Sequence, residues 1–310
     1  MRAHRVGADD PGRQTGRHPN RRGSICLESA TVSAHQAFPA DQFVMTLHAP
    51  RIAERATPGA FVHVQCDTSI PLRRPISLLG ADSKTGQIEL LYKRVGAGTT
   101  ALAEQAIGAE LSVLGPIGNG FSPNPNFRQA LLLGGGVGIP PMVYLARELH
   151  REGGITPTVF MGSEVPFPFA TGRAQVALPG VPTAVNATMT ALDVLGIGAR
   201  LASMAGFDGC HRGFVTDVAR DWLRAQAPSV RNSVQVFACG PEPMLKASAA
   251  LAAEFALNAY LCLEEYMACA VGGCAGCTVL VHDSGEQKMQ RVCVDGPVFP
   301  ARAIYPHVSP

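Results

Sequence analysis

The segment Ala130-Leu-Leu-Leu-Gly-Gly-Gly-Val-Gly-Ile-Pro-Pro-Met142 joins an apolar strand to a glycine-rich turn and then to a helix, which we expect over Pro141 to Arg151. Glycines in such a turn let backbone N–H groups and the start of a helix approach a pyrophosphate. The turn departs from the G-x-G-x-x-G pattern, so an ordinary strand-to-helix turn is the alternative. The candidate dinucleotide-binding residues are Gly134, Gly135, Gly136 and Gly138.

A second turn, Cys239-Gly-Pro241, follows the later apolar strand Val234 to Ala238. With a further strand over Thr158 to Met161, this alternation of strands and helices predicts a parallel sheet in a Rossmann-like α/β domain. The carboxyl ends of parallel strands share one edge, so Gly240 and Pro241 are expected to line the same crevice as the first turn. Cys239 would then touch a nicotinamide ring and is the candidate catalytic residue; a buried structural cysteine is the alternative. Glu164 is a candidate acceptor for ribose hydroxyls, which would favour NAD over NADP.

Upstream, residues 25 to about 121 contain short strands separated by turns. Phe43 to His48, Phe61 to Gln65 and Gln87 to Tyr92 are rich in β-branched, aromatic and alternating residues. Several such strands at short, regular spacing predict a small antiparallel β-barrel.

The barrel segment also contains motifs that suit a flavin nucleotide. In Arg74-Pro-Ile-Ser77 an arginine can pair with phosphate, a proline holds an extended strand and a serine hydroxyl can reach a flavin ring. Leu91-Tyr-Lys93 is followed by Gly96-Ala-Gly-Thr99, which offers backbone N–H groups and a hydroxyl to a pyrophosphate. Each motif alone is typical of an ordinary strand or loop. Their order before the glycine-rich turn is what favours a flavin.

Downstream, Cys269, Cys274, Cys277 and Cys293 have the spacing C-x4-C-x2-C-x15-C. This spacing is the plant-type arrangement in which a tight loop holds a [2Fe–2S] cluster. Small residues between the first three cysteines would let backbone N–H groups approach the sulfides. A structural zinc site is the alternative, although zinc knuckles usually contain two C-x2-C pairs.

Composition sets wider limits. The net charge of +2 gives no general case for nucleic-acid or membrane binding.

No segment is typical of a membrane span or a secretion signal, so we expect a cytoplasmic protein. Nine cysteines in that compartment indicate metal or redox chemistry before disulfides. We expect residues 1–24, which contain six arginines and little apolar material, to form a basic disordered arm.

With these motifs in this order, the chain resembles the ferredoxin–NADP reductase superfamily, and within it the electron-transfer subunits of heterodimeric, NAD-dependent dihydroorotate dehydrogenases. The resemblance also includes Gly115-Pro-Ile-Gly-Asn-Gly-Phe121 and Cys293-Val-Asp-Gly-Pro-Val-Phe299. It implies an FAD-binding β-barrel over 25–122, an NAD-binding α/β domain over 123–255 and a [2Fe–2S] domain over 256–310.

The resemblance also implies roles. The four cluster cysteines would ligate iron. Electrons would pass from dihydroorotate, through FMN in a separate catalytic subunit, to the cluster, FAD and NAD in pyrimidine biosynthesis, in an assembly with two of each subunit. The residues that would line the flavin are Arg74, Pro75, Ile76, Ser77, Leu91, Tyr92, Lys93, Gly98 and Thr99.

Two features depart from the family pattern. One is the basic arm, and the other is the long Ala/Gly-rich region 170–208. Across the wider region Phe167 to Gly209 we expect loops with one or two helices. An NAD(P)H-dependent flavin/iron–sulfur reductase serving ferredoxin or a hydrogenase is the second functional hypothesis. A non-enzymatic zinc-binding interaction protein is the third, and it leaves the flavin and glycine motifs unexplained.

Overall fold

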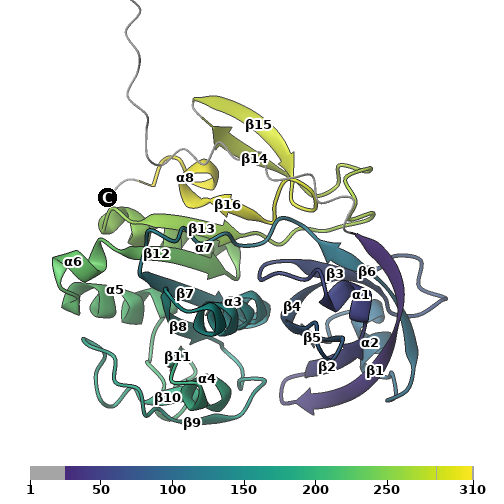
Figure 1. The fold of residues 1–310 in the computed structure, drawn as a ribbon, viewed down its shortest axis with the longest axis horizontal. Helices are drawn as coiled ribbons and strands as arrows, with labels where there is room; N and C mark the ends of the chain where they lie inside the picture. Colours follow the sequence, from purple (N-terminus) through teal and green to yellow (C-terminus); the bar gives the residue numbers. More distant parts are fainter. Residues whose placement is uncertain (1–24, 284, 309–310) are drawn as a thin grey trace, which may run out of the picture.

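The computed structural model describes residues 25–283 and 285–308, which form a β-barrel, an α/β domain and a C-terminal segment (Figure 1). The predicted basic arm lies outside the described residues. Among the described residues, no helix has the length and apolar character needed to cross a membrane.

The barrel is closed and antiparallel, with strand order β1-β2-β5-β4-β3-β6. Its strands are β1 (Cys26–Phe38), β2 (Gln42–His48), β3 (Phe61–Gln65), β4 (Arg74–Asp82), β5 (Gln87–Lys93) and β6 (Glu110–Ile117). Two short helices, α1 (Pro50–Ala53) and α2 (Ala97–Ala103), lie in its connections. The predicted barrel is confirmed, and the three strands expected from alternation all lie within β2, β3 and β5.

The α/β domain is built on a six-stranded sheet of order β11-β8-β7-β12-β13-β16. Five of these strands run parallel and β16 runs antiparallel to β13. The strands are β7 (Gln129–Gly135), β8 (Thr156–Gly162), β11 (Gly198–Ala202), β12 (Val234–Cys239), β13 (Asn258–Cys262) and β16 (Val298–Pro300). The helices of the domain are η2 (Gly136–Gly138), α3 (Ile139–Glu152), α4 (Thr190–Val194), α5 (Val215–Ala225), α6 (Pro228–Arg231) and α7 (Glu242–Glu254). The predicted Rossmann-like domain is confirmed.

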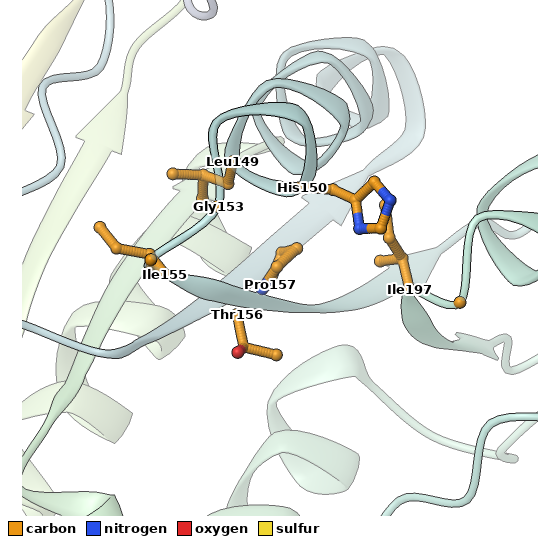
Figure 2. Close-up of a pocket in the computed structure, with 9 residues that line it drawn as sticks. Leu149, His150, Gly153, Ile155, Thr156, Pro157 and Ile197 are labelled. Carbon is orange, nitrogen blue, oxygen red and sulfur yellow. The ribbon is translucent and has the colours of Figure 1, made fainter.

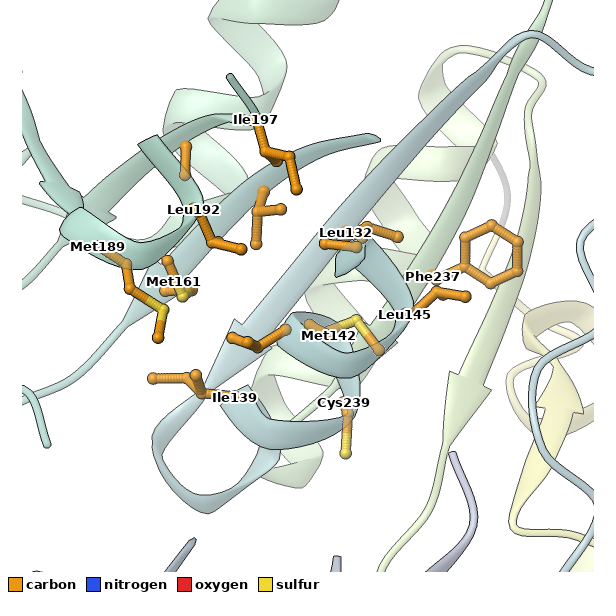
Figure 3. Close-up of a cluster of buried hydrophobic side chains, with 14 of the residues drawn as sticks. Leu132, Ile139, Met142, Leu145, Met161, Met189, Leu192, Ile197, Phe237 and Cys239 are labelled. Carbon is orange, nitrogen blue, oxygen red and sulfur yellow. The ribbon is translucent and has the colours of Figure 1, made fainter. Parts of the chain in front are cut away.

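Helix α3 connects the α/β domain to the barrel. Its apolar residues, including Met142 and Leu145, pack on the sheet in one buried cluster (Figure 3). Tyr144, on the same helix, belongs to the barrel core and donates a hydrogen bond to the Ala56 carbonyl at 3.2 Å. Arg147 forms an ion pair with Glu89 of β5 at 2.9 Å. The two domains therefore share packed residues as well as a chain connection.

The region 167–209 differs from expectation. It contains α4, but also the paired strands β9 (Thr171–Arg173) and β10 (Ala187–Met189), and β11 at the edge of the main sheet. The expectation of loops with one or two helices was wrong for these strands. These strands are only three to five residues long. Every residue of β10 and β11 is buried, so neither strand shows an alternation of buried and exposed residues.

The C-terminal segment contains the hairpin β14 (Thr278–Asp283) and β15 (Glu286–Arg291) and the short helix α8 (Ala301–Ile304), drawn in yellow-green and yellow in Figure 1. Strands β13 and β16, which flank the cysteine loop, both add to the sheet of the α/β domain. The cysteine loop is therefore fixed at both ends to that sheet. The domain boundary after residue 255 stays a prediction.

Candidate electron-transfer site

The two glycine turns lie side by side at the carboxyl edge of the parallel sheet. They end β7 and β12, which are neighbours in the centre of the sheet, where the strand order reverses. A Cβ on Gly138 would lie 2.4 Å from the Cys239 carbonyl carbon and 2.5 Å from the Gly240 nitrogen. A Cβ on Gly135 would lie 2.4 Å from Met244 Sδ. Glycine at these positions is what allows the turns to touch, and such a reversal is where α/β sheets bind dinucleotides.

Helix α3 begins directly after the first turn. Gly138 is its N-cap, and proline stands in its first turn, where no intrahelical donor is lost. Its 14 residues give a helix dipole whose positive end lies beside the turn. The structure thus brings together all four predicted glycines of the first turn with Gly240 and Pro241 of the second.

Cys239 is fully buried at the end of β12, in the same cluster as Ile139 and Met142 (Figure 3). It is paired in register with Cys262 of β13, and the two thiols interact. The Cys262 thiol and burial together raise the pKa of Cys239, so the thiol is protonated at neutral pH. Sequence spacing gave no role to Cys262, since adjacency across parallel strands joins residues distant in the chain.

Glu164 lies just beyond β8, at the same edge of the sheet, and is exposed. The Met204 backbone N–H approaches its carboxylate at 3.5 Å. A hollow of about 160 Å³ lies instead at the opposite edge, where β8 begins and α3 ends (Figure 2). It is lined by residues such as His150 and Thr156, and it lies away from both glycine turns. The hollow contains none of the predicted dinucleotide-binding residues, so the two turns stay the predicted crevice.

Of the predicted flavin residues, Arg74 at the start of β4 and Gly98 lie directly against each other. A Cβ on Gly98, in the first turn of α2, would lie 2.6 Å from Arg74 Nε. The guanidinium therefore rests directly on the start of α2. Within the described residues it forms no ion pair with an acidic side chain and donates only to the carbonyls of Leu72 and Arg73. A half-buried cation with no acidic partner suits a bound phosphate.

Thr99 is in α2 and not in a loop. Its hydroxyl accepts hydrogen bonds from the N–H groups of Val95 and Gly96 at 2.9 and 3.2 Å. This hydroxyl stabilises the turn that places Gly98 under Arg74. Ser77 is half-buried on β4, two strand positions beyond Pro75, which is exposed.

The remaining predicted flavin residues are more enclosed. Ile76 and Tyr92 belong to the barrel core, while Leu91 packs in the core of the α/β domain. The Tyr92 hydroxyl is 2.8 Å from His35 Nε2, and its ring stacks on Phe43 with centroids 5.4 Å apart. Burial raises the pKa of Tyr92. Lys93 is half-buried at the end of β5. At Leu91 and Tyr92 the backbone is therefore better placed than the side chain to face a ligand.

The cysteine loop has a backbone shaped to present N–H groups. Ala270 and Ala275 have positive φ values of 55° and 54°, which non-glycine residues rarely adopt, and Gly272 has φ 82°. The Cys274 N–H donates to Cys269 Sγ, and the Gly276 N–H donates to Cys274 Sγ, both at 3.4 Å. Backbone N–H groups that are directed at the sulfurs of one loop in this way suit a bound anionic group.

The four cysteines approach one another in two pairs. The thiols of Cys269 and Cys274 interact, and so do those of Cys277 and Cys293. In residues 25–283 and 285–308, no three Cys, His, Asp or Glu side chains converge as ligands of one metal ion. Interacting thiols of this kind suit a [2Fe–2S] cluster, and the C-x4-C-x2-C-x15-C spacing remains the ground for preferring the cluster to zinc.

The electrostatics of the loop also suit thiolate ligands. Burial raises the pKa of the Cys269 thiol, but the backbone N–H groups of Val271, Cys274 and Gly273 outweigh it and bring that pKa to about 7. Burial, and then the Cys277 thiol, raise the pKa of Cys293. A metal ion would supply the positive charge that the buried thiols of Cys277 and Cys293 need in order to ionise.

The cluster segment is attached to the end of the barrel. The Asn119 N–H donates to the Gly296 carbonyl at 2.6 Å, and Asn119 Nδ2 donates to the Val294 carbonyl at 3.0 Å. Gly118, with φ +92°, would bring a Cβ within 2.4 Å of Pro297 Cδ. The two phrases singled out in the sequence, residues 115–121 and 293–299, therefore contact each other. This contact links the cluster to the flavin barrel.

Comparison with known proteins agrees with this geometry. Residues 264–305 match the family model of the iron–sulfur cluster binding domain of dihydroorotate dehydrogenase B. The electron transfer subunit of dihydroorotate dehydrogenase B (NAD(+)) from Geobacillus sp. (strain WCH70) is 36% identical over 282 residues, covering 88% of this chain and 96% of the relative. The same subunit from Bacillus caldolyticus is 37% identical over 284 residues, covering 89% and 98%.

Solved structures share the fold. The structure of an NADH-dependent reduced ferredoxin–NADP oxidoreductase, described for flavin-based electron bifurcation, has a TM-score of 0.71 and 26% identity and covers 89% of each chain. Phthalate dioxygenase reductase has a TM-score of 0.54 and 15% identity, covering 89% of this chain and 96% of that one. Because relatives more than 30% identical match over nearly their whole length, this chain belongs to the family of dihydroorotate dehydrogenase B (NAD(+)) electron transfer subunits.

Proposed function

We propose that this chain receives electrons from a dihydroorotate-oxidising, FMN-containing catalytic subunit and delivers them to NAD, in pyrimidine biosynthesis. The route runs through the [2Fe–2S] cluster and FAD within this chain. The assembly we propose contains two copies of each subunit and acts in the cytoplasm, where thiol ligands stay reduced. The observation that carries the proposal is the contact between the cluster segment and the flavin barrel, joined to a dinucleotide crevice in one chain.

The order of the three groups follows from their chemistry. A nicotinamide exchanges hydride, an iron–sulfur cluster exchanges single electrons, and a flavin does both. The chain's own residues bind and orient these groups. Cys269, Cys274, Cys277 and Cys293 are the proposed iron ligands, and loop N–H groups donate to the sulfurs of Cys269 and Cys274, where they would stabilise the thiolates.

The remaining roles are proposed from position. Arg74 and the start of α2 would hold the flavin pyrophosphate, since the cation lies on Gly98 without an acidic partner among the described residues. The turns at Gly134–Gly138 and Gly240–Pro241 would hold the NAD pyrophosphate. Cys239, which is buried at the end of β12, is the residue we propose to contact the nicotinamide ring.

Glu164 would accept the ribose hydroxyls of NAD, since an acid beyond the second strand suits a diol and repels a 2′-phosphate. The exposed position of this carboxylate leaves it free to do so. We propose NAD in preference to NADP on this ground.

A second function has one specific observation in its favour. The NADH-dependent ferredoxin–NADP oxidoreductase structure resembles the chain along 89% of its length. A reductase that serves ferredoxin would use the same flavin, cluster and nicotinamide sites, so the cofactors alone do not separate the two functions.

The test mixes the purified holoprotein with a dihydroorotate-oxidising subunit and follows NAD reduction. The first function predicts dihydroorotate-dependent NADH formation only in the mixture. Formation of NADH with reduced ferredoxin, and none with dihydroorotate and the catalytic subunit, would establish the second function instead. Glu164→Gln should weaken NAD binding and leave flavin and iron contents unchanged.

A further inference from the structure

His63 occupies the face of the barrel that meets the cluster segment. Along β3, Val62 and Val64 point into the barrel core, while Phe61 and His63 point away from it. Phe61 belongs to the buried cluster that contains Cys277 and Cys293. The β3 residue His63 is paired with Pro75 of the flavin-motif strand β4 and with Leu114 of β6, which also packs on the cluster segment.

The imidazole is buried but unsatisfied. His63 is 1% exposed, and neither ring nitrogen has a hydrogen-bond partner among the described residues. Burying such a group without a partner costs about 1–3 kcal/mol, so native proteins rarely leave one. The backbones of Arg73 and Met267 lie close enough to the ring to influence the pKa of His63.

These two neighbours belong to the two cofactor sites. Arg73 immediately precedes Arg74, the proposed phosphate-binding residue. Met267 is two residues before Cys269, the first proposed iron ligand. The ring therefore lies between the start of the flavin strand and the approach to the cluster loop.

We propose that His63 is a positioning residue: when the cluster is bound, one ring N–H donates to the Met267 carbonyl and fixes the cluster loop against the flavin strand. This inference rests on the proposed function, because it requires FAD and the cluster in the same chain. Its role is to hold a constant separation between the two groups, on which the rate of electron passage depends.

The protonation state is consistent with that role. Burial, and then the charge of Arg73, lower the pKa of His63 to about 4. The neutral ring keeps one N–H donor and adds no charge between the cofactors. It therefore positions the loop without itself titrating at neutral pH.

The experiment compares variants of the holoprotein by anaerobic rapid mixing with NADH, following the flavin and cluster bands separately. His63→Phe removes both ring nitrogens and keeps the bulk. His63→Asn keeps a donor near the Nδ1 position, and His63→Gln keeps one near Nε2. Val64→Ala, on the same strand but facing the barrel core, is the control for lost stability.

The expected result is that His63→Phe keeps flavin, iron and the rate of flavin reduction by NADH, but slows flavin-to-cluster transfer several-fold, because the cluster loop is no longer held at a fixed distance from the flavin. The low-temperature EPR signal of its reduced cluster should also change. One of the two amide variants should restore both, and Val64→Ala should lower the melting temperature without slowing the transfer.

Several results would overturn the proposal. One is wild-type transfer in His63→Phe; another is equal slowing in Val64→Ala. Slow transfer in both amide variants with flavin and iron retained, or loss of iron from all three His63 variants, would also overturn it. A wild-type protein without flavin or iron bands would instead contradict the proposed function itself.

Discussion

At the residue scale, Gly138 is required by space and not by its backbone angle. Its φ of −86° is open to any residue, but an added Cβ would fall 2.4 Å from the carbonyl carbon and oxygen of Cys239. Gly136 is the opposite case, since its φ is +54° and no atom lies within 4 Å of an added Cβ. Within one turn, glycine is therefore needed at position 138 for close approach of the backbone and at position 136 for a positive φ.

Gly138→Ala should therefore force the two turns apart. We expect a loss of about 2–3 kcal/mol in unfolding free energy and a large rise in the Kd for NADH. Gly136→Ala should cost about 1–2 kcal/mol, the strain of a left-handed alanine, with a smaller effect on Kd. Urea unfolding and NADH titration of both variants measure this. Equal effects of the two substitutions would mean that the turns do not need to touch.

His63 also predicts a pH dependence of stability. Its pKa is lowered from the ordinary 6.5 to about 4, so below pH 6.5 the unfolded chain binds a proton that the folded protein does not. Stability should fall as pH drops from about 6.5 to about 4, by up to about 3 kcal/mol from this group. His63→Gln should lose that part of the slope in unfolding experiments across this range. An unchanged slope would show that the pKa of His63 is the same in the folded and the unfolded protein.

At the element scale, the sequence predicted elements wherever a pattern was long enough to see. Strand β3 coincides with the predicted Phe61–Gln65, and α3 extends the predicted helix by only two residues at its start and one at its end. The strands of the Ala/Gly-rich region were not predicted because β10 and β11 are short and buried on both faces. Strands of that kind are recognised only from their partners, β9 and β8.

Arg200 explains how that region is held. From the middle of β11 its buried guanidinium donates to the carbonyls of Val185, Ala199 and Val176 at 2.9, 2.7 and 2.8 Å. One side chain thereby connects β11 to the segments that flank it. Burial lowers the pKa of Arg200, but the side chain stays charged at neutral pH.

Arg200→Met should leave three carbonyls without their donor. We expect a loss of about 2–3 kcal/mol in unfolding free energy and faster hydrogen exchange in residues 171–202. Arg212→Met, at an exposed position, is the matched control and should change stability by less than about 0.5 kcal/mol. If Arg200→Met lowered the unfolding free energy by no more than Arg212→Met does, the region would be held by its apolar contacts alone.

At the scale of the whole molecule, sequence motifs identified each site but not how the sites meet. The cysteine spacing predicted the cluster because its ligands are close together in the chain. The pairing of Cys239 with Cys262 and the place of His63 beside Met267 depend on residues far apart in sequence. No local pattern distinguishes such a histidine from an ordinary buried one. The junction between the flavin barrel and the cluster could therefore be found only from the fold.

The central claim, that nicotinamide, flavin and cluster exchange electrons within this one chain, is tested most directly by an anaerobic NADH titration of the purified protein. The account predicts flavin and iron–sulfur bands that both bleach, with about three electrons taken up per chain, two by FAD and one by the cluster. Cys274→Ser should lose the cluster bands and take up about two electrons, while Cys210→Ser, outside the cluster loop, should match the wild type. A flavin that bleaches while an intact cluster stays oxidised, or a Cys274→Ser protein with normal iron content, would contradict the account.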